Sequence, residues 1–152
     1  MIQLFRKILC PIDFSQHSLA ALDVALNLTQ QNDAKLYLLN VAPVPAGAAG
    51  FQPVPMDPYP FLEKDRQEHL AKLGRERIPA AVRYETLVIS GDPAEQVLNT
   101  AHGLAIDLIV MGTHGRKGLG HLVLGSVAER VVRESAVPVL TAHSTAHVRK
   151  AD

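Results

Sequence analysis

Short, nearly continuous runs of hydrophobic residues alternate along this chain with longer segments that are hydrophobic on one face only. Runs of this kind, bounded by turn residues, predict strands of a sheet that is buried on both faces. We expect such strands at Ile8–Ile12, Leu36–Val41, Leu108–Met111 and Val137–Ala142. A fifth strand is expected at Tyr84–Ile89, nearer the edge of the sheet, because polar residues interrupt the first half of that run.

The segments between the strands carry hydrophobic residues at helical spacing. Ser15 can cap the first helix, which is expected to end at the polar residues Gln30–Asp33. Asp92 can cap the third helix, with Pro93 at its first helical position. The second and fourth helices are expected over Leu62–Arg77 and Ser126–Ser135.

This alternation of strands and helices predicts a parallel, doubly wound α/β sheet, because crossovers between parallel strands are right-handed. The 152 residues are enough for one domain with its own core. The proline-rich connection Ala42–Pro60 breaks the rhythm. It is expected to be a mobile surface loop, and a lid over a ligand is the sharper alternative.

Composition argues against several classes of function. Fifteen Lys and Arg residues balance fifteen Asp and Glu residues, so no uniform positive field favours nucleic acid or anionic lipid as a partner. No hydrophobic stretch approaches the roughly 20 residues that cross a bilayer, and no secretory signal is recognisable, so a cytoplasmic protein is expected. Cys10, the single cysteine, stands among hydrophobic residues and is expected to be a buried thiol.

A glycine pattern follows the fourth predicted strand. Gly112, Gly115, Gly125 and Ser126 fit the spacing G-x-x-G, nine residues, then G-[ST]. Glycine lets backbone N–H groups approach an anion closely, and the start of the last helix adds unpaired N–H groups and a favourable dipole. Because open α/β sheets bind ligands beyond the carboxyl ends of their strands, Asp13 after the first strand is expected to belong to the same site, the alternative being a structural cap of the first helix.

Two better-known phosphate motifs nearly occur in this segment and are rejected. Gly118 and Gly120 begin a G-x-G-x-x-G pattern, but Val123 stands where the third glycine is required. The segment from Gly120 resembles a Walker A loop, but Ser126 occupies the position of the lysine. Neither a dinucleotide-binding fold nor a P-loop ATPase is therefore supported.

Taken together and in order, several segments resemble the universal stress protein family along nearly the whole chain. These segments are ILCPIDFS at 8–15, GDP at 91–93, IVMGTHGR at 109–116, LGSVAERV at 124–131 and VPVL at 137–140. We predict a single domain over residues 1–143, with a five-stranded parallel sheet in strand order 3-2-1-4-5, followed by a tail at 144–152.

The chain resembles the ATP-binding branch of that family, in which the nucleotide lies between strands one and four. The resemblance implies that Asp13 lies near the ribose and any Mg²⁺ or Mn²⁺ bound to the phosphates, and that the backbone at Val41 meets the adenine. His114 could bind a phosphate or face solvent, and Arg116 could neutralise an outer phosphate or form a solvated basic pair with Lys117. The full implied site is Pro11, Asp13, Val41, Met111, Gly112, His114, Gly115, Arg116, Gly125, Ser126 and Val127.

These observations favour a regulatory module that binds ATP, or AMP or ADP, and changes the surface it offers to a protein partner. A slow ATP-hydrolysing enzyme and an interaction module with a vestigial nucleotide site are the alternatives. Phosphoryl transfer requires a positioned nucleophile and neutralised charge, and the sequence offers no ordered set of such groups. The hydrophobic last strand, Val137–His143, is expected to join a homodimer, the alternative being a monomer whose tail covers that edge.

Overall fold

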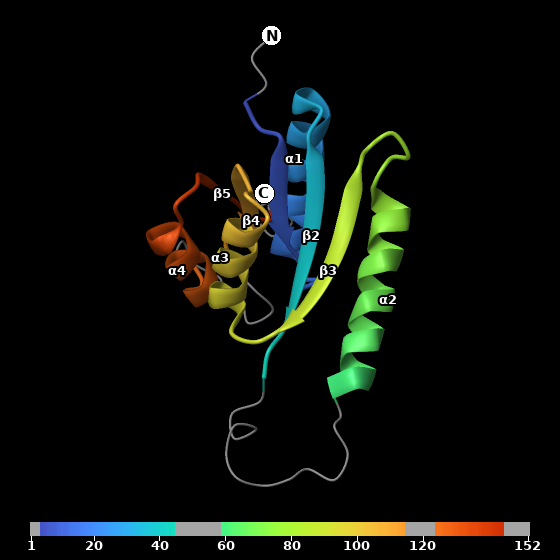
Figure 1. The fold of residues 1–152 in the computed structure, drawn as a ribbon, viewed down its shortest axis with the longest axis vertical. Coiled ribbons are helices and arrows are strands. Elements are labelled where there is room, and N and C mark those ends of the chain that lie inside the picture. Colours follow the sequence, from blue (N-terminus) through green and yellow to red (C-terminus); the bar gives the residue numbers. More distant parts are fainter. Residues whose placement is uncertain (1–3, 45–58, 115–123, 145–152) are drawn as a thin grey trace, which may run out of the picture.

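A computed structural model of the protein describes residues 4–44, 59–114 and 124–144, with the backbone alone at 59–62 (Figure 1). Strands and helices alternate along the chain. They are β1 (Lys7–Pro11), α1 (Gln16–Asn32), β2 (Lys35–Ala42), α2 (Tyr59–Arg77), β3 (Tyr84–Ser90), α3 (Pro93–Gly103), β4 (Leu108–Gly112), α4 (Ser126–Glu134) and β5 (Val139–Ala142). No helix in these ranges is long and apolar enough to cross a membrane.

The five strands form one parallel sheet in the order β3-β2-β1-β4-β5. The predicted doubly wound fold and its strand order are therefore confirmed. The chain runs outward from β1 to β3, then returns to the other side of β1 as β4. The strand order reverses between β1 and β4, and the carboxyl ends of these two strands are where sheets of this kind bind ligands.

Two layers of side chains pack on opposite faces of the sheet. One face lies against α1 and α2, with Leu22 and Leu70 among its fully buried residues, and the other lies against α3 and α4, with Val97 and Val131 (Figure 1). Cys10 belongs to the first layer and has no exposed surface, so the predicted core thiol is confirmed. Its burial raises the pKa of the thiol, which keeps it protonated and unreactive.

Most predicted element ends lie within one residue of the observed ones, and two differ by more. The helix α2 begins at Tyr59 rather than at Leu62. The strand β5 begins at Val139 rather than at Val137, because the Ser135 hydroxyl binds both the N–H and the carbonyl of Val137 locally. The connection predicted as a loop or lid is described only at its two ends, and residues 45–58 lie outside the described part of the chain.

Both predicted helix caps are confirmed. The Ser15 hydroxyl accepts a hydrogen bond from the N–H of Ser18 at 3.2 Å, and Asp92 Oδ2 accepts one from the N–H of Glu95 at 2.9 Å. These bonds satisfy N–H groups that the first helical turn leaves without an internal partner. They also fix where α1 and α3 leave the carboxyl edge of the sheet.

Candidate functional site

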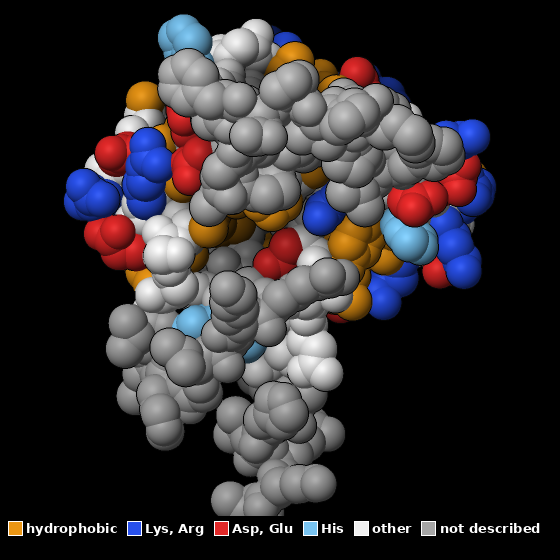
Figure 2. All heavy atoms as spheres, turned by 90° about the horizontal axis from the view of Figure 1, so that it is seen from below, with side chains coloured by type: hydrophobic (Ala, Val, Ile, Leu, Met, Phe, Trp, Pro, Cys, Tyr) orange, Lys and Arg blue, Asp and Glu red, His pale blue; other side chains and the backbone are white. Residues whose placement is uncertain are grey.

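The carboxyl edge of the sheet brings together the ends of several strands. Figure 2 views this edge and shows hydrophobic, acidic and basic side chains around a depression near the middle of the molecule. The strands β1, β2 and β4 all end there, and α1 and α4 begin there. Residues that are far apart in the sequence thus meet at one edge, as the sequence predicted.

The apolar residues of the predicted site lie on one face of the sheet. Met111 is buried among the residues under α3 and α4, and Val41 and Val127 pack against the same cluster. Pro11 is two positions after Leu9, a member of that cluster, so its side chain points to the same face. Met111 is therefore part of the core, whereas Pro11, Val41 and Val127 are partly exposed and are the apolar side chains that this face could offer to an aromatic ring.

Asp13 follows β1 in a turn with an unusual backbone. One carboxylate oxygen, Oδ1, accepts a hydrogen bond from the N–H of Ser15 at 2.9 Å. The intervening Phe14 has a φ of 64°, in the left-handed region that bulky residues rarely adopt. The turn therefore stores backbone strain next to the predicted site, a common feature of binding sites. Asp13 both supports the start of α1 and presents a partly exposed carboxylate at the edge of the sheet.

The end of β4 and the start of α4 are tied together. The N–H of Gly125 donates to the carbonyl of Thr113 at 2.7 Å. Gly125 is the N-cap of α4 and offers no side chain to the first helical turn, and Ser126 beside it is exposed. Within the described residues no side chain caps the N–H groups at the start of α4, which lie beside the last residues of β4 and suit an anion.

Gly112 has a packing role that the glycine pattern did not reveal. A Cβ atom at this position would lie 2.8 Å from the carbonyl carbon of His17 and 2.9 Å from the N–H nitrogen of Ser18. Real Cβ atoms essentially never come that close to backbone. Glycine is therefore required here for the close approach of α1 to β4, whatever binds at the edge.

His114 is partly buried against α1. Its ring lies 5.3 Å from the ring of His17, and its Nδ1 is 3.0 Å from the hydroxyl of Thr113. His17 in turn accepts a hydrogen bond from the N–H of Ser144, just after β5. The predicted site residues Gly115 and Arg116 lie outside the described residues, so their predicted roles stay predictions.

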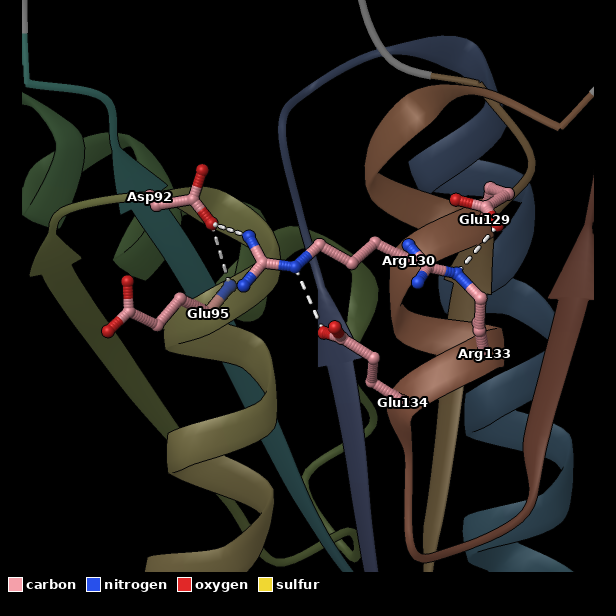
Figure 3. A network of polar contacts seen from close by, with 6 residues as sticks. All are labelled: Asp92, Glu95, Glu129, Arg130, Arg133 and Glu134. Atoms are coloured by element: carbon pink, nitrogen blue, oxygen red, sulfur yellow. Dashed lines mark hydrogen bonds and ion pairs between the residues drawn. The ribbon is translucent and has the colours of Figure 1, made fainter.

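An arginine connects α4 to the start of α3. Arg130 Nη1 binds Asp92 Oδ2 at 2.8 Å, and its Nε binds Glu134 at 2.9 Å (Figure 3). Asp92 is also the N-cap of α3, so one carboxylate holds both helices. Exposed ion pairs contribute little stability, but this geometry fixes the position of α4, which begins at Ser126 after its N-cap, Gly125.

Two polar residues at this edge were not singled out from the sequence. Asn40 is 1% exposed, and its amide donates to the carbonyl of Ile12 at 2.6 Å. Its Oδ1 accepts a hydrogen bond from Arg66 Nη1, from α2, at 2.9 Å. Asn40 could have been noticed, because it is a polar residue inside a hydrophobic run and a buried amide needs partners. Arg66 could not, because its helix is charged throughout.

Comparison with known proteins agrees with the fold. The Universal stress protein family matches residues 4–143, and the chain belongs to this family. The universal stress protein MJ0531 of Methanocaldococcus jannaschii is 35% identical over 142 residues, which cover 90% of this chain and 81% of that protein.

Solved structures are similar along nearly the whole chain. UspA from Lactobacillus plantarum has a TM-score of 0.75 at 26% identity, covering 90% of this chain and 97% of that one. A universal stress protein solved in complex with cAMP has a TM-score of 0.70 at 23% identity, covering 92% of this chain and 98% of that one. At 23% identity, the similarity to the structure with cAMP concerns the fold alone.

Proposed function

We propose that this universal stress protein binds ATP, or AMP or ADP, at the carboxyl ends of β1 and β4 and acts in the cytoplasm as a nucleotide-dependent regulatory module. The observation that carries the proposal is the start of α4, which has no side-chain cap and is held beside β4 by the bond from Gly125 to Thr113. Such N–H groups bind phosphate. The partly exposed side chain of Val41 is an apolar contact for the adenine, and a protein of similar fold has been solved with cAMP.

The proposed divalent ion, Mg²⁺ or Mn²⁺, is carried by the phosphates. Among the described residues no group of three His, Cys, Asp or Glu side chains gathers to hold a metal directly. Asp13 uses one carboxylate oxygen in its turn, and the other is the group we assign to the ribose or to the hydrated ion. A divalent ion bound in this way neutralises phosphate charge next to the start of α4.

Titration calorimetry with ATP and Mg²⁺ tests the proposal. We expect a single saturable site per chain. A pyrimidine nucleotide should bind more weakly or not at all, because the larger purine ring makes more contact with apolar side chains at this edge. Mass spectrometry of ligand released from the purified protein checks the same point independently. Absence of heat and of copurified nucleotide would favour the interaction module with a vestigial site.

We propose binding with at most slow hydrolysis. Phosphoryl transfer is fast when charge is neutralised at the outer phosphates and a residue orients the nucleophile. In the described part of the site, Asp13 is the one acidic side chain assigned to the ligand, and it also holds the turn before α1. A regulatory module that switches with nucleotide occupancy needs no faster chemistry.

We further propose a homodimer joined through β5. This strand is an edge of the sheet, and its Leu140 is 36% exposed. Unpaired strand edges with exposed hydrophobic residues favour pairing across a two-fold axis.

Light scattering at micromolar concentration is expected to give the dimer mass. Leu140→Glu should give the monomer, whereas Leu4→Glu, at a residue 68% exposed and far from β5 in the sequence, should not. A monomer mass for the unchanged protein would contradict the dimer.

A further inference from the structure

A guanidinium group from α2 is fixed at the carboxyl end of β2 by a buried asparagine. Asn40 donates to the carbonyl of Ile12 at 2.6 Å, just beyond β1, and accepts from Arg66 Nη1 at 2.9 Å. A buried amide oxygen without a partner is costly, so the bond to Arg66 is strongly favoured. The guanidinium therefore has a defined position at the carboxyl end of β2, on the α2 side of the sheet, whereas the side chain of the next residue, Val41, faces the other side.

Arg66 has binding capacity that the protein does not use within its described part. A guanidinium carries five N–H donors and two flat faces, and the bond to Asn40 occupies one donor. Arg77, Arg83 and Arg130 are all paired with carboxylates. Among the described residues Arg66 has no such ion pair, and its side chain is partly exposed. A cation held in this way at a ligand-binding edge is suited to contact the ligand.

The strand order determines which part of a nucleotide Arg66 can meet. The proposed phosphate position is at the start of α4, beside β4, and β1 separates β4 from β2. Neighbouring strands lie about 4.8 Å apart, so the end of β2 lies roughly 10 Å from the end of β4. A nucleotide with its phosphates at Gly125 therefore presents its base, rather than its phosphates, to the end of β2, where Asn40 holds Arg66.

We propose that Arg66 is a specificity-determining residue that holds the base of the bound nucleotide by laying its guanidinium plane against the ring. This inference rests on the proposed function and assigns one further residue to the same site. A guanidinium is planar and weakly hydrated, and it stacks on aromatic rings more readily than an ammonium group does. The hydrogen bond to Asn40 orients the guanidinium of Arg66 in the ligand-free protein, so less conformational entropy is lost on binding.

The Arg66→Met variant tests the contact. Its affinities for ATP and for AMP are measured by calorimetry, and a nucleotide that binds too weakly for direct titration is measured by competition with the other. Methionine keeps the unbranched side chain and removes the charged plane. We expect about tenfold weaker binding of both nucleotides, because a base contact is the same whatever the number of phosphates. If ATP loses far more affinity than AMP, Arg66 acts on the phosphates and the inference is wrong. Unchanged affinity for both nucleotides also overturns it.

Two matched variants separate the contact from charge and from folding. Arg66→Lys keeps the positive charge and a donor for Asn40, so it should fold normally yet bind both nucleotides several-fold more weakly. Full affinity in Arg66→Lys would exclude a planar contact. If Arg66→Met does not fold, the Arg66→Lys measurement alone decides the inference. Arg75→Met, at an exposed arginine on the same helix, should bind like the unchanged protein. Failure of the unchanged protein to bind either nucleotide would reject the proposed function itself.

Discussion

Gly125→Val is expected to abolish most ATP binding while leaving the domain folded. Gly125 has a φ of −61° and a ψ of 161°, an extended conformation that valine adopts without strain. Its branched side chain would stand at the uncapped start of α4, in front of the N–H groups assigned to the phosphates. Losing one or two hydrogen bonds to a charged group corresponds to about 100-fold weaker binding.

Calorimetry with ATP and Mg²⁺ measures this loss, and circular dichroism melting shows whether the variant is folded. Gly103→Val is the matched control, because a Cβ atom at Gly103 would meet nothing within 4 Å and this residue ends α3 at the opposite edge of the sheet. It should bind ATP normally. A Gly125→Val protein that is folded and binds with unchanged affinity would reject the start of α4 as the phosphate position.

The fold could be predicted because its strongest signals are local. Hydrophobic runs of strand length, helical stripes and two side-chain caps each constrain a few neighbouring residues, and they agree with one another. The start of β5 was predicted too early because a competing local interaction, between the Ser135 hydroxyl and the backbone of Val137, does not appear in hydrophobic patterning. Pro138, which has no N–H group, follows directly and also delays regular pairing.

The candidate site was predictable in part, for a different reason. Residues that follow β1 and β4 meet because parallel strands bring their carboxyl ends to one edge, so Asp13 and Gly112 could be placed there from the sequence. The bond from Arg66 to Asn40 depends on how α2 packs on the sheet, which no spacing along the chain encodes. The left-handed backbone of Phe14 was equally invisible, because glycine is the residue usually expected at such a turn.

Gly112→Ala is expected to destabilise the protein, in contrast to the substitution at Gly125. The added methyl group would meet the backbone of His17 and Ser18 at less than 3 Å, and backbone cannot move aside as a flexible side chain can. To relieve the clash, α1 must shift away from β4, which disturbs packing between two elements of the core. Forcing an extra carbon into a filled space typically costs about 1–3 kcal/mol.

Thermal and urea unfolding measure the effect, and a loss of that size should lower Tm by roughly 5 °C in a domain of this length. Gly103→Ala, which replaces another glycine where there is open space, should leave stability unchanged or slightly higher. If Gly112→Ala kept its stability but bound ATP more weakly, Gly112 would serve the ligand alone and the packing role would be wrong. If instead stability falls, weaker binding follows from the shift of α1, because the turn at Asp13 and Phe14 leads directly into that helix.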